Sequence, residues 1–477
     1  MKRSELILEL GGDDTQPRYL RLAAALLGAI ERGRLRPGDL LPGTRALSTQ
    51  LGLHRNTVNA AFHELILQGW LVAEASRGTR VAPDLPALGK VPAPPRRTAA
   101  PAPAERDTTM PLRVSDGIPD SRLLPAADLA RAFRRAILRP MQGVADGYGD
   151  PRGTPALRQA LTGYLGQERG IATVADDLIV TRGSQMAIYL AARASLAPGQ
   201  AIAVEDPGYR LAWAAFHAAG AHIVGVPVDA QGLDVAALES LLAQRHDIGA
   251  VYVTPHHQYP TTATLGAGRR LRLLELARRY RLTVIEDDYD HEYRFAGRPV
   301  LPLAARAEAD APVIYIGSLS KLLSPEIRLG YAVARPDIVA RMAEIRNVID
   351  RQGDAPLEIA MAELIADGTL ARHARKARRI YEGRRDRLVD ALRRRLGDTL
   401  VVDTPSGGLA LWTRLHDDIA ADAWSAAATD LGVHIAGGTH YALDPARAPN
   451  AFRIGFAKLA DDEIETVVER LAASRPA

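Results

Sequence analysis

The chain has 477 residues, which is enough for two or more domains, and 24% of them are charged. Its formal net charge of +4 at pH 7 permits nucleic-acid binding but does not by itself indicate it. The absence of cysteine excludes disulfides and zinc sites built from cysteine. The start of the chain lacks the apolar core of a signal peptide, and no run approaches the about 18 apolar residues that span a bilayer. We therefore expect a cytoplasmic protein without a membrane partner.

Residues 1–82 contain the first predicted elements, which are three helices followed by two short strands. Apolar residues at helical spacing after Pro17 predict a first helix, which ends at Gly33. The elements after it are a short helix that ends at Gly52, a third helix at about 54–68, and strands near 71–72 and 79–81. This order predicts a winged helix-turn-helix, in which one helix enters the major groove of DNA.

Polar residues gather at the start of the third helix, where a recognition helix meets base edges and phosphates. The residues that we predict to contact double-stranded DNA are Arg45, Arg55, Asn56, Thr57, Asn59, Arg77 and Gly78. Any one of them alone is common on protein surfaces. The alternative is a small helical packing domain whose polar residues are merely solvated.

The stretch from Gly33 to Pro42, with Arg45 and the run from Arg55 to Val58 after it, resembles the DNA-binding domain of the GntR family of bacterial regulators. The resemblance covers residues 15–82 and includes turn, helix and wing in the same order. His54 stands where that family often has a Ser-type cap. The tip of the hairpin reads Ser-Arg-Gly-Thr instead of Gly-x-Gly-Thr. The resemblance implies a DNA operator as partner.

A change of composition separates this module from the rest of the chain. Eight prolines lie from Pro83 to Pro111, interleaved with alanine and with Arg96-Arg97. Such a stretch cannot form a core and is expected to behave as a semi-stiff, partly polyproline spacer. We therefore predict a DNA-binding domain at 1–82, a linker at 83–112 and a larger domain at 113–477.

The larger domain alternates helical and strand patterns, which predicts an α/β fold of the doubly wound type. Its predicted buried strands lie near 178–181, 201–204, 250–253, 283–285 and 313–316. Sheets of this type bind ligands outside the carboxyl ends of their strands. Several of the predicted strands end in residues that carry chemistry, so we expect a ligand at that edge.

Lys321 is one of only five lysines in a chain whose basic residues are mostly arginine. A primary amine that loses its proton forms a Schiff base with an aldehyde, and a guanidinium cannot do so. Ser318, Ser320 and Arg328 supply hydroxyls and a planar fork suited to a phosphate. An amine beside such groups indicates a site for pyridoxal 5'-phosphate (PLP). The alternative is a lysine on a surface loop.

Three further segments follow predicted strands and suit the same cofactor. The turn Gly183-Ser184-Gln185 opens a helix whose N–H groups suit a phosphate. Tyr209 offers a ring that could stack on the pyridine, and a carboxylate from 286–290 could bind the ring nitrogen. Tyr289 lies close enough in sequence to reach the ring oxygen. Taken singly, these segments are equally explained by an ordinary helix start, a packed tyrosine and a solvated or metal-binding acidic loop. We predict no metal ligands.

This ordered set resembles the fold-type I PLP enzymes, the aspartate aminotransferase-like class. The resemblance implies that Lys321 forms the Schiff base with the cofactor and that Asp287 pairs with the ring nitrogen. It also implies that Tyr289 contacts the ring oxygen and that Tyr209 stacks on the ring. The residues that it implies for the phosphate are Gly183, Ser184, Gln185, Ser318, Ser320 and Arg328.

Two residues outside this set are also matched by the resemblance. Tyr148 resembles the tyrosine that reaches the phosphate of the neighbouring subunit, which implies a homodimer. Arg453 resembles the arginine that binds a substrate carboxylate, and the alternative is an arginine on a surface strand.

The combination of a winged helix, a proline-rich linker and such a domain resembles the MocR/PdxR subfamily of GntR-type regulators over nearly the whole chain. The segments that carry this resemblance are 148–153, 254–260, 286–294 and 317–331. Relatives usually have Pro-Thr-Gly or Pro-Ser-Gly where this chain has Pro260-Thr261-Thr262, which lacks easy access to positive backbone angles. His257 or Gln258 could hydrogen-bond near the ring oxygen.

Together the two predicted sites indicate a transcriptional regulator whose larger domain senses PLP or a PLP adduct of an amino compound. An amine effector would displace Lys321, and the change would alter operator affinity through the linker. A second hypothesis is a working aminotransferase that carries a DNA-tethering domain, although slow or abortive transamination is the activity that we expect. A third hypothesis is a DNA-binding scaffold with a degenerate cofactor fold.

Overall fold

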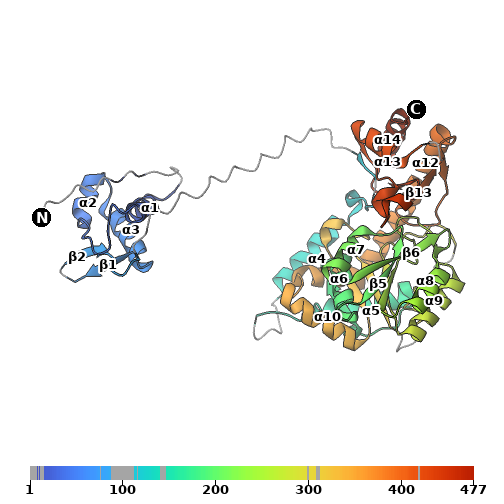
Figure 1. Ribbon diagram of the computed structural model, residues 1–477, viewed down its shortest axis with the longest axis horizontal. Helices are drawn as coiled ribbons and strands as arrows, with labels where there is room; N and C mark the ends of the chain where they lie inside the picture. Colours follow the sequence, from blue (N-terminus) through green and yellow to red (C-terminus); the bar gives the residue numbers. More distant parts are fainter. Residues whose placement is uncertain are drawn as a thin grey trace. The chain divides into compact units, whose positions relative to one another are not determined.

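The computed structural model describes residues 8, 10, 16–75, 77–86, 112–114, 116–139, 147–297, 300–307, 312–416 and 419–476. These residues belong to two compact units that divide between Arg106 and Asp107 (Figure 1). The greater part of the predicted linker, 87–111, lies outside the described residues. The predicted domain boundaries therefore stay a prediction.

The smaller unit contains three helices and one antiparallel hairpin. Its elements are α1 (Arg18–Glu31), α2 (Thr44–Leu51), α3 (Arg55–Leu67), β1 (Leu71–Glu74) and β2 (Gly78–Val81). Gly52 ends α2 in a left-handed conformation, with φ at +62°, which allows the tight turn into α3. The predicted winged helix-turn-helix is confirmed.

Apolar residues spaced one helical turn apart form the core of the smaller unit. Leu22 and Leu26 of α1, Leu47 of α2, and Val58 and Leu65 of α3 are all buried. Burying each such side chain contributes about 1.5–3 kcal/mol of hydrophobic free energy. Val58 and Leu65 lie on one stripe of α3, so the opposite, polar stripe of that helix stays in solvent.

The larger unit is built on an eight-stranded sheet in the order β4-β11-β10-β9-β8-β5-β6-β7. Its strands are β4 (Leu178–Thr181), β5 (Ala201–Asp206), β6 (His222–Asp229), β7 (Gly232–Leu233), β8 (Ile248–Val253), β9 (Thr283–Asp288), β10 (Val313–Ser318) and β11 (Gly330–Val333). Neighbours from β10 to β6 are parallel, whereas β11 is antiparallel to both β10 and β4. The predicted α/β fold is confirmed, and β6, β7 and β11 are strands that the sequence analysis did not predict.

Helices cover both faces of this sheet (Figure 1). Those packed on one face are α6 (Ser184–Ser195), α7 (Arg210–Ala218) and α10 (Pro336–Ile349). Those packed on the other face are α5 (Pro155–Arg169), α8 (Val235–Gln244), α9 (Ala267–Tyr280) and α11 (Ala355–Ala366), with α4 (Ala126–Leu138) against α11. The faces alternate along each strand because successive side chains point to opposite sides.

The C-terminal part of the larger unit has a sheet of its own. Its strands are β12 (Leu400–Val402), β13 (Ala410–Leu415) and β15 (Ala451–Gly455), and a separate parallel pair joins β3 (Leu112–Arg113) to β14 (Val433–His434). Its helices are α12 (Thr369–Leu396), α13 (Ala421–Asp430) and α14 (Asp461–Ala473). Short 3-10 helices lie at Ser121–Leu123, Ala175–Asp177, Pro325–Ile327, Gly438–Tyr441 and Pro445–Arg447.

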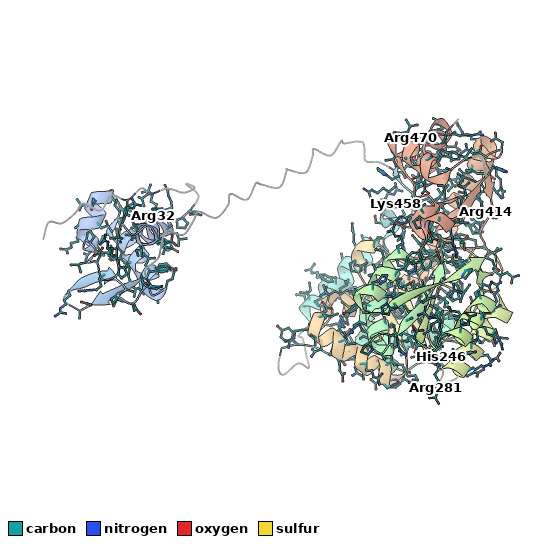
Figure 2. The ribbon with its side chains drawn as sticks, in the orientation of Figure 1. Arg32, His246, Arg281, Arg414, Lys458 and Arg470 are labelled. Carbon is teal, nitrogen blue, oxygen red and sulfur yellow. The ribbon has the colours of Figure 1, made fainter. Side chains whose placement is uncertain are left out.

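Charged side chains lie on the outside of both units. The labelled residues of Figure 2, which are all exposed, are Arg32, His246, Arg281, Arg414, Lys458 and Arg470. The longest helix, α12, has 28 residues and many arginines along its length. Among the described residues, none of the helices combines the length and the apolar character that crossing a membrane requires.

Candidate cofactor site and nucleic-acid interface

The predicted cofactor residues meet at one edge of the large sheet. β5, β8, β9 and β10 run parallel, so their carboxyl ends share an edge, and β4 ends there too because two antiparallel pairings separate it from β10. Gly183 and Tyr209 follow β4 and β5, and Asp287 and Ser318 lie at the carboxyl ends of β9 and β10. Sequence positions more than a hundred residues apart therefore become neighbours.

Lys321 lies in the turn that follows β10. Its Nζ donates a hydrogen bond to the backbone oxygen of Gly117 at 2.9 Å. Burial lowers the pKa of the Lys321 ammonium below its usual 10.5, against the attraction of Asp116. A lower pKa increases the share of neutral amine, which is the nucleophilic form. The amine is therefore prepared for attack on a carbonyl carbon.

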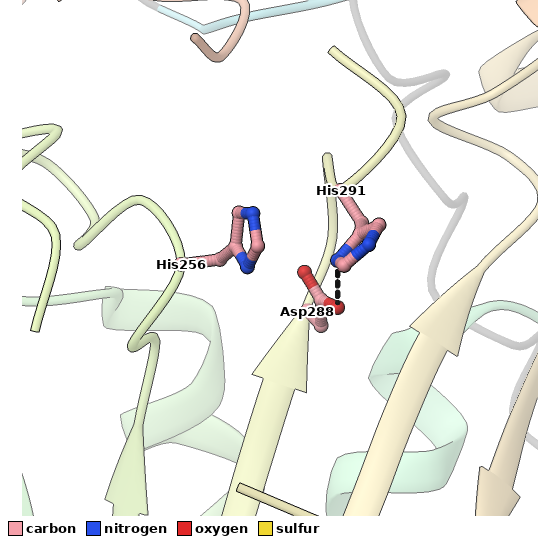
Figure 3. A group of neighbouring side chains, drawn as sticks. All are labelled: His256, Asp288 and His291. Carbon is pink, nitrogen blue, oxygen red and sulfur yellow. Dashed lines mark ion pairs between the residues drawn. The ribbon is translucent and has the colours of Figure 1, made fainter. Parts of the chain in front are cut away.

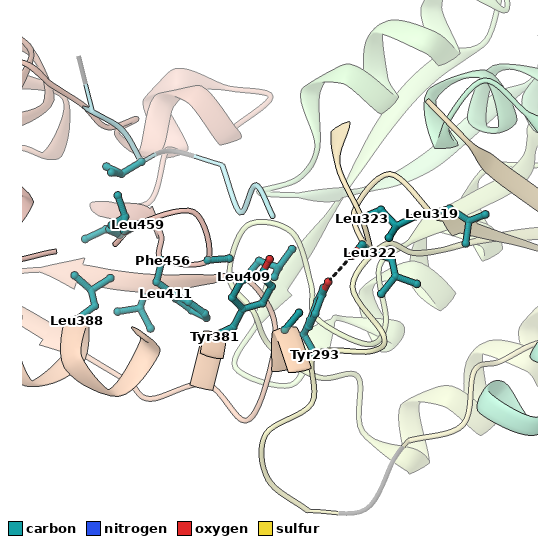
Figure 4. Packing of buried hydrophobic residues seen from close by; sticks show 14 of the residues in the cluster. Tyr293, Leu319, Leu322, Leu323, Tyr381, Leu388, Leu409, Leu411, Phe456 and Leu459 are labelled. Carbon is teal, nitrogen blue, oxygen red and sulfur yellow. Dashed lines mark hydrogen bonds between the residues drawn. The ribbon is translucent and has the colours of Figure 1, made fainter. Parts of the chain in front are cut away.

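The turn that carries Lys321 is fixed by apolar packing. Leu319, Leu322 and Leu323 are buried on its far side, in the core cluster that Figure 4 shows. The hydroxyl of Tyr293 donates to the Leu322 oxygen at 3.0 Å, and its ring packs on Tyr381 with centroids 5.0 Å apart. The amine is thus held on a rigid support.

The residues predicted to hold a phosphate surround the start of α6. Gly183 precedes this helix with φ at +76°, and a methyl group on it would lie 2.7 Å from Nη2 of Arg328. That Nη2 donates to the Arg182 oxygen at 3.0 Å. The guanidinium and the N–H groups at the start of α6 therefore face the same space, which suits an anion.

The serines and the glutamine of the same set make local hydrogen bonds. The Ser318 hydroxyl accepts from the Lys321 amide at 3.3 Å, and the Ser320 hydroxyl donates to the Leu329 oxygen at 3.3 Å. Gln185 donates through Nε2 to the Leu211 oxygen of α7 at 2.6 Å. Both serines lie beside Lys321, whereas the amide of Gln185 points toward α7.

Asp287, in β9, has a buried carboxylate with one free oxygen. Its Oδ2 accepts from the Tyr252 hydroxyl at 2.7 Å, while Oδ1 is buried without a hydrogen-bond partner among the described residues. Burial raises the pKa of Asp287 to about 7. A buried unpaired acceptor costs about 1–3 kcal/mol, so an N–H⁺ donor at Oδ1 would stabilise it. The pyridinium nitrogen of PLP is such a donor, and the residues present fit this cofactor.

Three tyrosines line the space beside Asp287 and Lys321. The ring of Tyr209 packs edge-on against that of Tyr259, with centroids 5.0 Å apart. The Tyr289 hydroxyl donates to the backbone oxygen of His257 at 2.9 Å. Burial raises the pKa of Tyr209 and of Tyr289 above their usual value, so both hydroxyls stay protonated. Each therefore remains a hydrogen-bond donor.

Of the two residues considered for the ring oxygen, Gln258 already has several partners. Its Nε2 donates to the backbone oxygens of Pro207 and Tyr259, at 2.9 and 2.6 Å. The His257 ring shares a hydrogen bond with Asp290 through Nδ1 at 2.7 Å, and its Nε2 is buried without a partner among the described residues. Nε2 of His257 can therefore form a further hydrogen bond, whereas Nε2 of Gln258 already has its partners.

Arg453 lies in β15 and is 1% exposed. Its Nη1 donates to the Pro260 oxygen at 2.7 Å, and its guanidinium lies 4.5 Å from the centre of the Tyr259 ring. The alternative of an arginine on a surface strand is therefore wrong. A buried cation beside the tyrosines offers a site for an anionic group, because its Nε has no partner among the described residues.

Tyr148, the residue predicted to reach the cofactor phosphate of a neighbouring subunit, has no described contact with the other predicted cofactor residues. Its side chain is 60% exposed, and the Arg351 guanidinium lies 4.1 Å above its ring. A residue in this position is available to a second copy of the chain.

Most of the predicted DNA-contacting residues of the smaller unit are exposed. Arg55, Asn56 and Asn59 are exposed along α3, and Thr57 is half-buried. The exposed residues outside α3 are Arg45 of α2, Arg77 of the hairpin tip and Gly78 at the start of β2. His54 replaces the Ser-type cap, because its Nδ1 accepts from the Asn56 amide at 3.2 Å. The start of α3 is therefore capped as a recognition helix requires.

Thr262 adopts the conformation that the glycine of related sequences would favour, with φ at +63°. A β-branched residue is strained in this region by about 1–2 kcal/mol. Glycine would relieve this strain, but it also gains entropy in the unfolded chain, which offsets part of the benefit. We therefore expect Thr262→Gly to raise the free energy of unfolding by only about 0.5–1 kcal/mol. Urea unfolding of the full chain measures this change.

The neighbouring Thr261 provides the matched control. Its hydroxyl donates to Gln258 Oε1 at 2.7 Å, and its φ is not positive. Thr261→Gly should lower the free energy of unfolding by about 1 kcal/mol, because it loses that hydrogen bond. A Thr262→Gly variant less stable than the wild type would contradict the argument from strain.

Glu205, in β5, is a site residue that the sequence analysis missed, because nothing in its sequence context marks it as buried. Its Oε2 accepts from the hydroxyl and amide of Thr254 at 2.5 and 3.2 Å, and from Gln258. Burial raises the pKa of Glu205 to about 7, and the nearby Asp287 raises it further. The buried carboxyl therefore keeps its proton in weakly acidic solution.

This shift gives a pH-dependent prediction for Glu205→Gln. As the pH rises from about 4.5 to about 7, the carboxyl ionises in the unfolded chain before it does so in the folded one, so the wild type loses stability. Glutamine cannot ionise. We therefore compare the free energy of unfolding of the variant with that of the wild type at two pH values. The difference should be more favourable to the variant by about 2–3 kcal/mol at pH near 8 than at pH near 5.

Denaturant unfolding of the full chain at both pH values measures the effect. Glu344→Gln, at an exposed position of α10, is the control and should show no such difference. Equal effects of Glu205→Gln at both pH values would mean that Glu205 does not titrate in this way.

The comparisons with known proteins agree with this geometry. Residues 113–471 match the family "Aminotransferase class I and II", and residues 18–81 match "Bacterial regulatory proteins, gntR family". The chain is 33% identical to the probable rhizopine catabolism regulatory protein MocR of Rhizobium meliloti, over 88% of this chain and 86% of that protein. It is 34% identical to the HTH-type pyridoxine biosynthesis transcriptional regulator PdxR of Corynebacterium glutamicum, over 76% of each.

Among solved structures, the larger unit is similar to the kynurenine aminotransferase of Pyrococcus horikoshii, crystallised in complex with PMP. The TM-score is 0.70 and the identity 29%, over 76% of this chain and 90% of that chain. With a gntR-family domain, a class I and II aminotransferase domain and these relatives, the chain belongs to the MocR/PdxR subfamily of GntR-type transcriptional regulators.

Proposed function

We propose that this protein is a DNA-binding transcriptional regulator whose larger unit binds PLP and responds to PLP itself or to an amino compound. The observation that carries the proposal is the pairing of a buried amine with a buried, unpaired carboxylate oxygen. Lys321 follows β10 and Asp287 lies in the neighbouring strand β9, in a chain that also has an exposed candidate recognition helix. The cytoplasm is the compartment that fits such a regulator.

When bound, PLP supplies an aldehyde that bonds reversibly to primary amines. Lys321 offers the amine, and Asp287 would hold the ring nitrogen through Oδ1. Tyr209 would pack on the ring, and the Tyr289 hydroxyl would exchange the His257 oxygen for the ring oxygen as its acceptor. The groups that would hold the phosphate are the α6 N–H groups of Ser184 and Gln185 after Gly183, the hydroxyls of Ser318 and Ser320, and the guanidinium of Arg328.

Arg453 suggests the class of effector. A buried guanidinium with an unpaired Nε favours a ligand that carries a carboxylate or a sulfonate. Such a ligand with a primary amine would place its acidic group near Arg453 and its amine near Lys321. The effector class that we propose is therefore an amine with an acidic group, with PLP alone as the other candidate.

The contact between Lys321 and Gly117 suggests how the site communicates with the linker. Gly117 lies five residues after Leu112, where the described part of the larger unit begins, and β3 leads into it. A Lys321 side chain that engages another group no longer donates to the Gly117 oxygen. The segment next to the linker would then be released, and by linkage DNA should alter ligand affinity in return.

We further propose a homodimer, which the exposed Tyr148 supports, with a DNA-binding domain at 1–82, a linker at 83–112 and an effector domain at 113–477. Titration of the full chain with PLP and then with amines, followed by absorbance with and without operator DNA, tests the function. Coupling requires that DNA shift the amine titration. An unshifted titration would contradict it.

A working aminotransferase that is tethered to DNA is the second candidate, because Lys321 and Arg453 both lie in the site. Turnover of an amino acid with a keto acid at about 1–1000 per second would favour it.

The recognition helix gives a prediction that is independent of the cofactor. Arg55→Ala should weaken operator binding by about 5- to 150-fold, because a base or phosphate contact of an arginine contributes about 1–3 kcal/mol. PLP absorbance should not change. Fluorescence anisotropy with labelled operator measures the affinity.

Arg18→Ala, at the exposed start of α1, removes the same charge from a helix that is not predicted to read bases. It should affect operator and unrelated DNA to the same small extent. An operator affinity that Arg55→Ala leaves at the wild-type value would overturn the assignment of α3.

A further inference from the structure

Three side chains that can bind a metal meet on the face of β9 opposite Asp287. Asp288 ends β9, His291 lies in the turn after it, and His256 follows the neighbouring strand β8 (Figure 3). All three are buried, with exposed fractions of 2%, 7% and 3%. One potential ligand atom from each lies within 4.8 Å of the others. The proposed regulatory site makes no use of them.

Each of the three side chains has a buried polar atom that lacks a hydrogen-bond partner among the described residues. His256 Nε2, Asp288 Oδ1 and His291 Nδ1 are all buried without one among the described residues. His291 Nδ1 lies 2.9 Å from Asp288 Oδ2, the ion pair drawn in Figure 3, but outside hydrogen-bond geometry. Each buried polar atom left unpaired costs about 1–3 kcal/mol. A cation among these three atoms would remove that cost.

The surroundings hold the Asp288 carboxylate in one orientation. The Tyr315 hydroxyl donates to Asp288 Oδ2 at 2.8 Å and accepts from Arg169 Nε at 2.9 Å. The charged residues beside the cluster include Arg169, Arg270, Arg294, Glu286, Asp288 and Glu292. Three cations and three anions leave no formal net charge, so the case for a metal ion rests on the unpaired ligand atoms and not on net charge. Hydrogen bonds of this kind fix ligands in metal sites.

We propose that His256, Asp288 and His291 bind one zinc ion. Two imidazole nitrogens and one carboxylate oxygen form a common zinc ligand set, and the fourth position belongs to water. Solvent reaches His291 through a pocket of about 200 Å³, whose other lining residues include Glu168 and Arg294. Ligands of tetrahedral zinc lie about 3.3 Å apart, for metal–ligand distances of about 2.0–2.1 Å. Because the ligand atoms lie within 4.8 Å of one another, binding requires their separations to shrink by no more than about 1.5 Å.

Such an ion would join the two loops that border the cofactor site. The loop after β8 carries His256 and Tyr259, and the loop after β9 carries Tyr289 and His291. The rings of Tyr259 and Tyr289 lie 6.3 Å apart. An ion that links His256 to His291 would also fix the spacing of these tyrosines.

The test uses the full chain, stripped with a chelator and reloaded with zinc or cobalt. We expect the wild type to bind one zinc per chain by mass spectrometry and to melt at a higher temperature with zinc than without it. Cobalt at the site should give the visible bands of a tetrahedral ion. His256→Gln and His291→Gln should take up only background metal. His246→Gln, at an exposed position labelled in Figure 2, should bind like the wild type.

Zinc uptake by the wild type that is no greater than that of His291→Gln would overturn the proposal. If either variant fails to fold, the cobalt spectrum of the wild type decides alone, and a spectrum without tetrahedral bands excludes the site. Iron bound in place of zinc, and lost in both variants, would overturn the choice of ion. PLP absorbance, measured on the same samples, reports separately on the cofactor site.

Discussion

Replacing Lys321 with alanine is expected to abolish the visible absorbance of bound PLP and to make operator binding indifferent to PLP and amines. The reason is chemical, because the amine of Lys321 is the nucleophile that we propose for the cofactor aldehyde, and alanine cannot bond to an aldehyde. The turn should keep its shape, since Leu319, Leu322 and Leu323 anchor it. Absorbance and operator anisotropy, measured with and without PLP, are the two readouts.

The matched control is Lys376→Ala, at an exposed lysine of α12. It removes an amine without touching the site, so both readouts should equal those of the wild type. Borohydride reduction followed by peptide mass mapping should find the pyridoxyl group on Lys321. A Lys321→Ala variant that still regulates in response to PLP, or a pyridoxyl group on another lysine, would refute the sensing mechanism.

Asp287→Asn is expected to weaken PLP binding by about 10- to 150-fold without unfolding the chain. The variant would remove the proposed charge-assisted hydrogen bond to the ring nitrogen, a kind of bond that contributes about 1.5–3 kcal/mol, and it conserves the volume of the side chain. The free Oδ1 is the atom concerned, since Oδ2 already accepts from Tyr252. Titration of the stripped protein with PLP, followed by absorbance, gives the affinity.

Tyr252→Phe separates the charge of Asp287 from its orientation. It removes the donor to Oδ2 but keeps the carboxylate, so the expected loss is only about fivefold, or 1 kcal/mol. If Asp287→Asn binds PLP as tightly as the wild type, Asp287 does not hold the ring nitrogen. A larger effect for Tyr252→Phe than for Asp287→Asn would point to a distorted strand instead.

The sequence was enough to locate the parts of the fold that rest on local signals. The winged helix follows from apolar spacing and from turns at Gly33 and Gly52, which act within a few residues. The buried strands that end near Asp287 and Ser318 are continuous apolar runs, as expected for parallel strands covered on both faces. Their shared edge then follows from the direction of the strands.

Features that depend on distant partners could not be predicted. β11 has only four residues and begins with Gly330, so its strand character comes from its pairing with β4 and β10. The burial of Arg453 depends on packing against Tyr259. His256 and His291 come from two separate loops, and only the parallel neighbours β8 and β9 bring them together.

Thr262 illustrates a different limit. A missing glycine suggested an altered loop, yet Thr262 takes the positive backbone angle itself. The surrounding hydrogen bonds, among them the Thr262 amide to the Gln258 oxygen at 2.7 Å, hold the threonine in this conformation. The hydrogen bonds of this loop thus outweigh the preference of threonine for negative φ, which amounts to about 1–2 kcal/mol.

The histidine that caps α3 differs chemically from the Ser-type residue that related proteins often have at this position. Because Nδ1 of His54 accepts the hydrogen bond from the Asn56 amide, the neutral ring carries its one N–H on Nε2. A capping serine would also keep a donor, its hydroxyl hydrogen, but on a much shorter side chain. The imidazole therefore places its donor farther from the backbone of α3, at an exposed position.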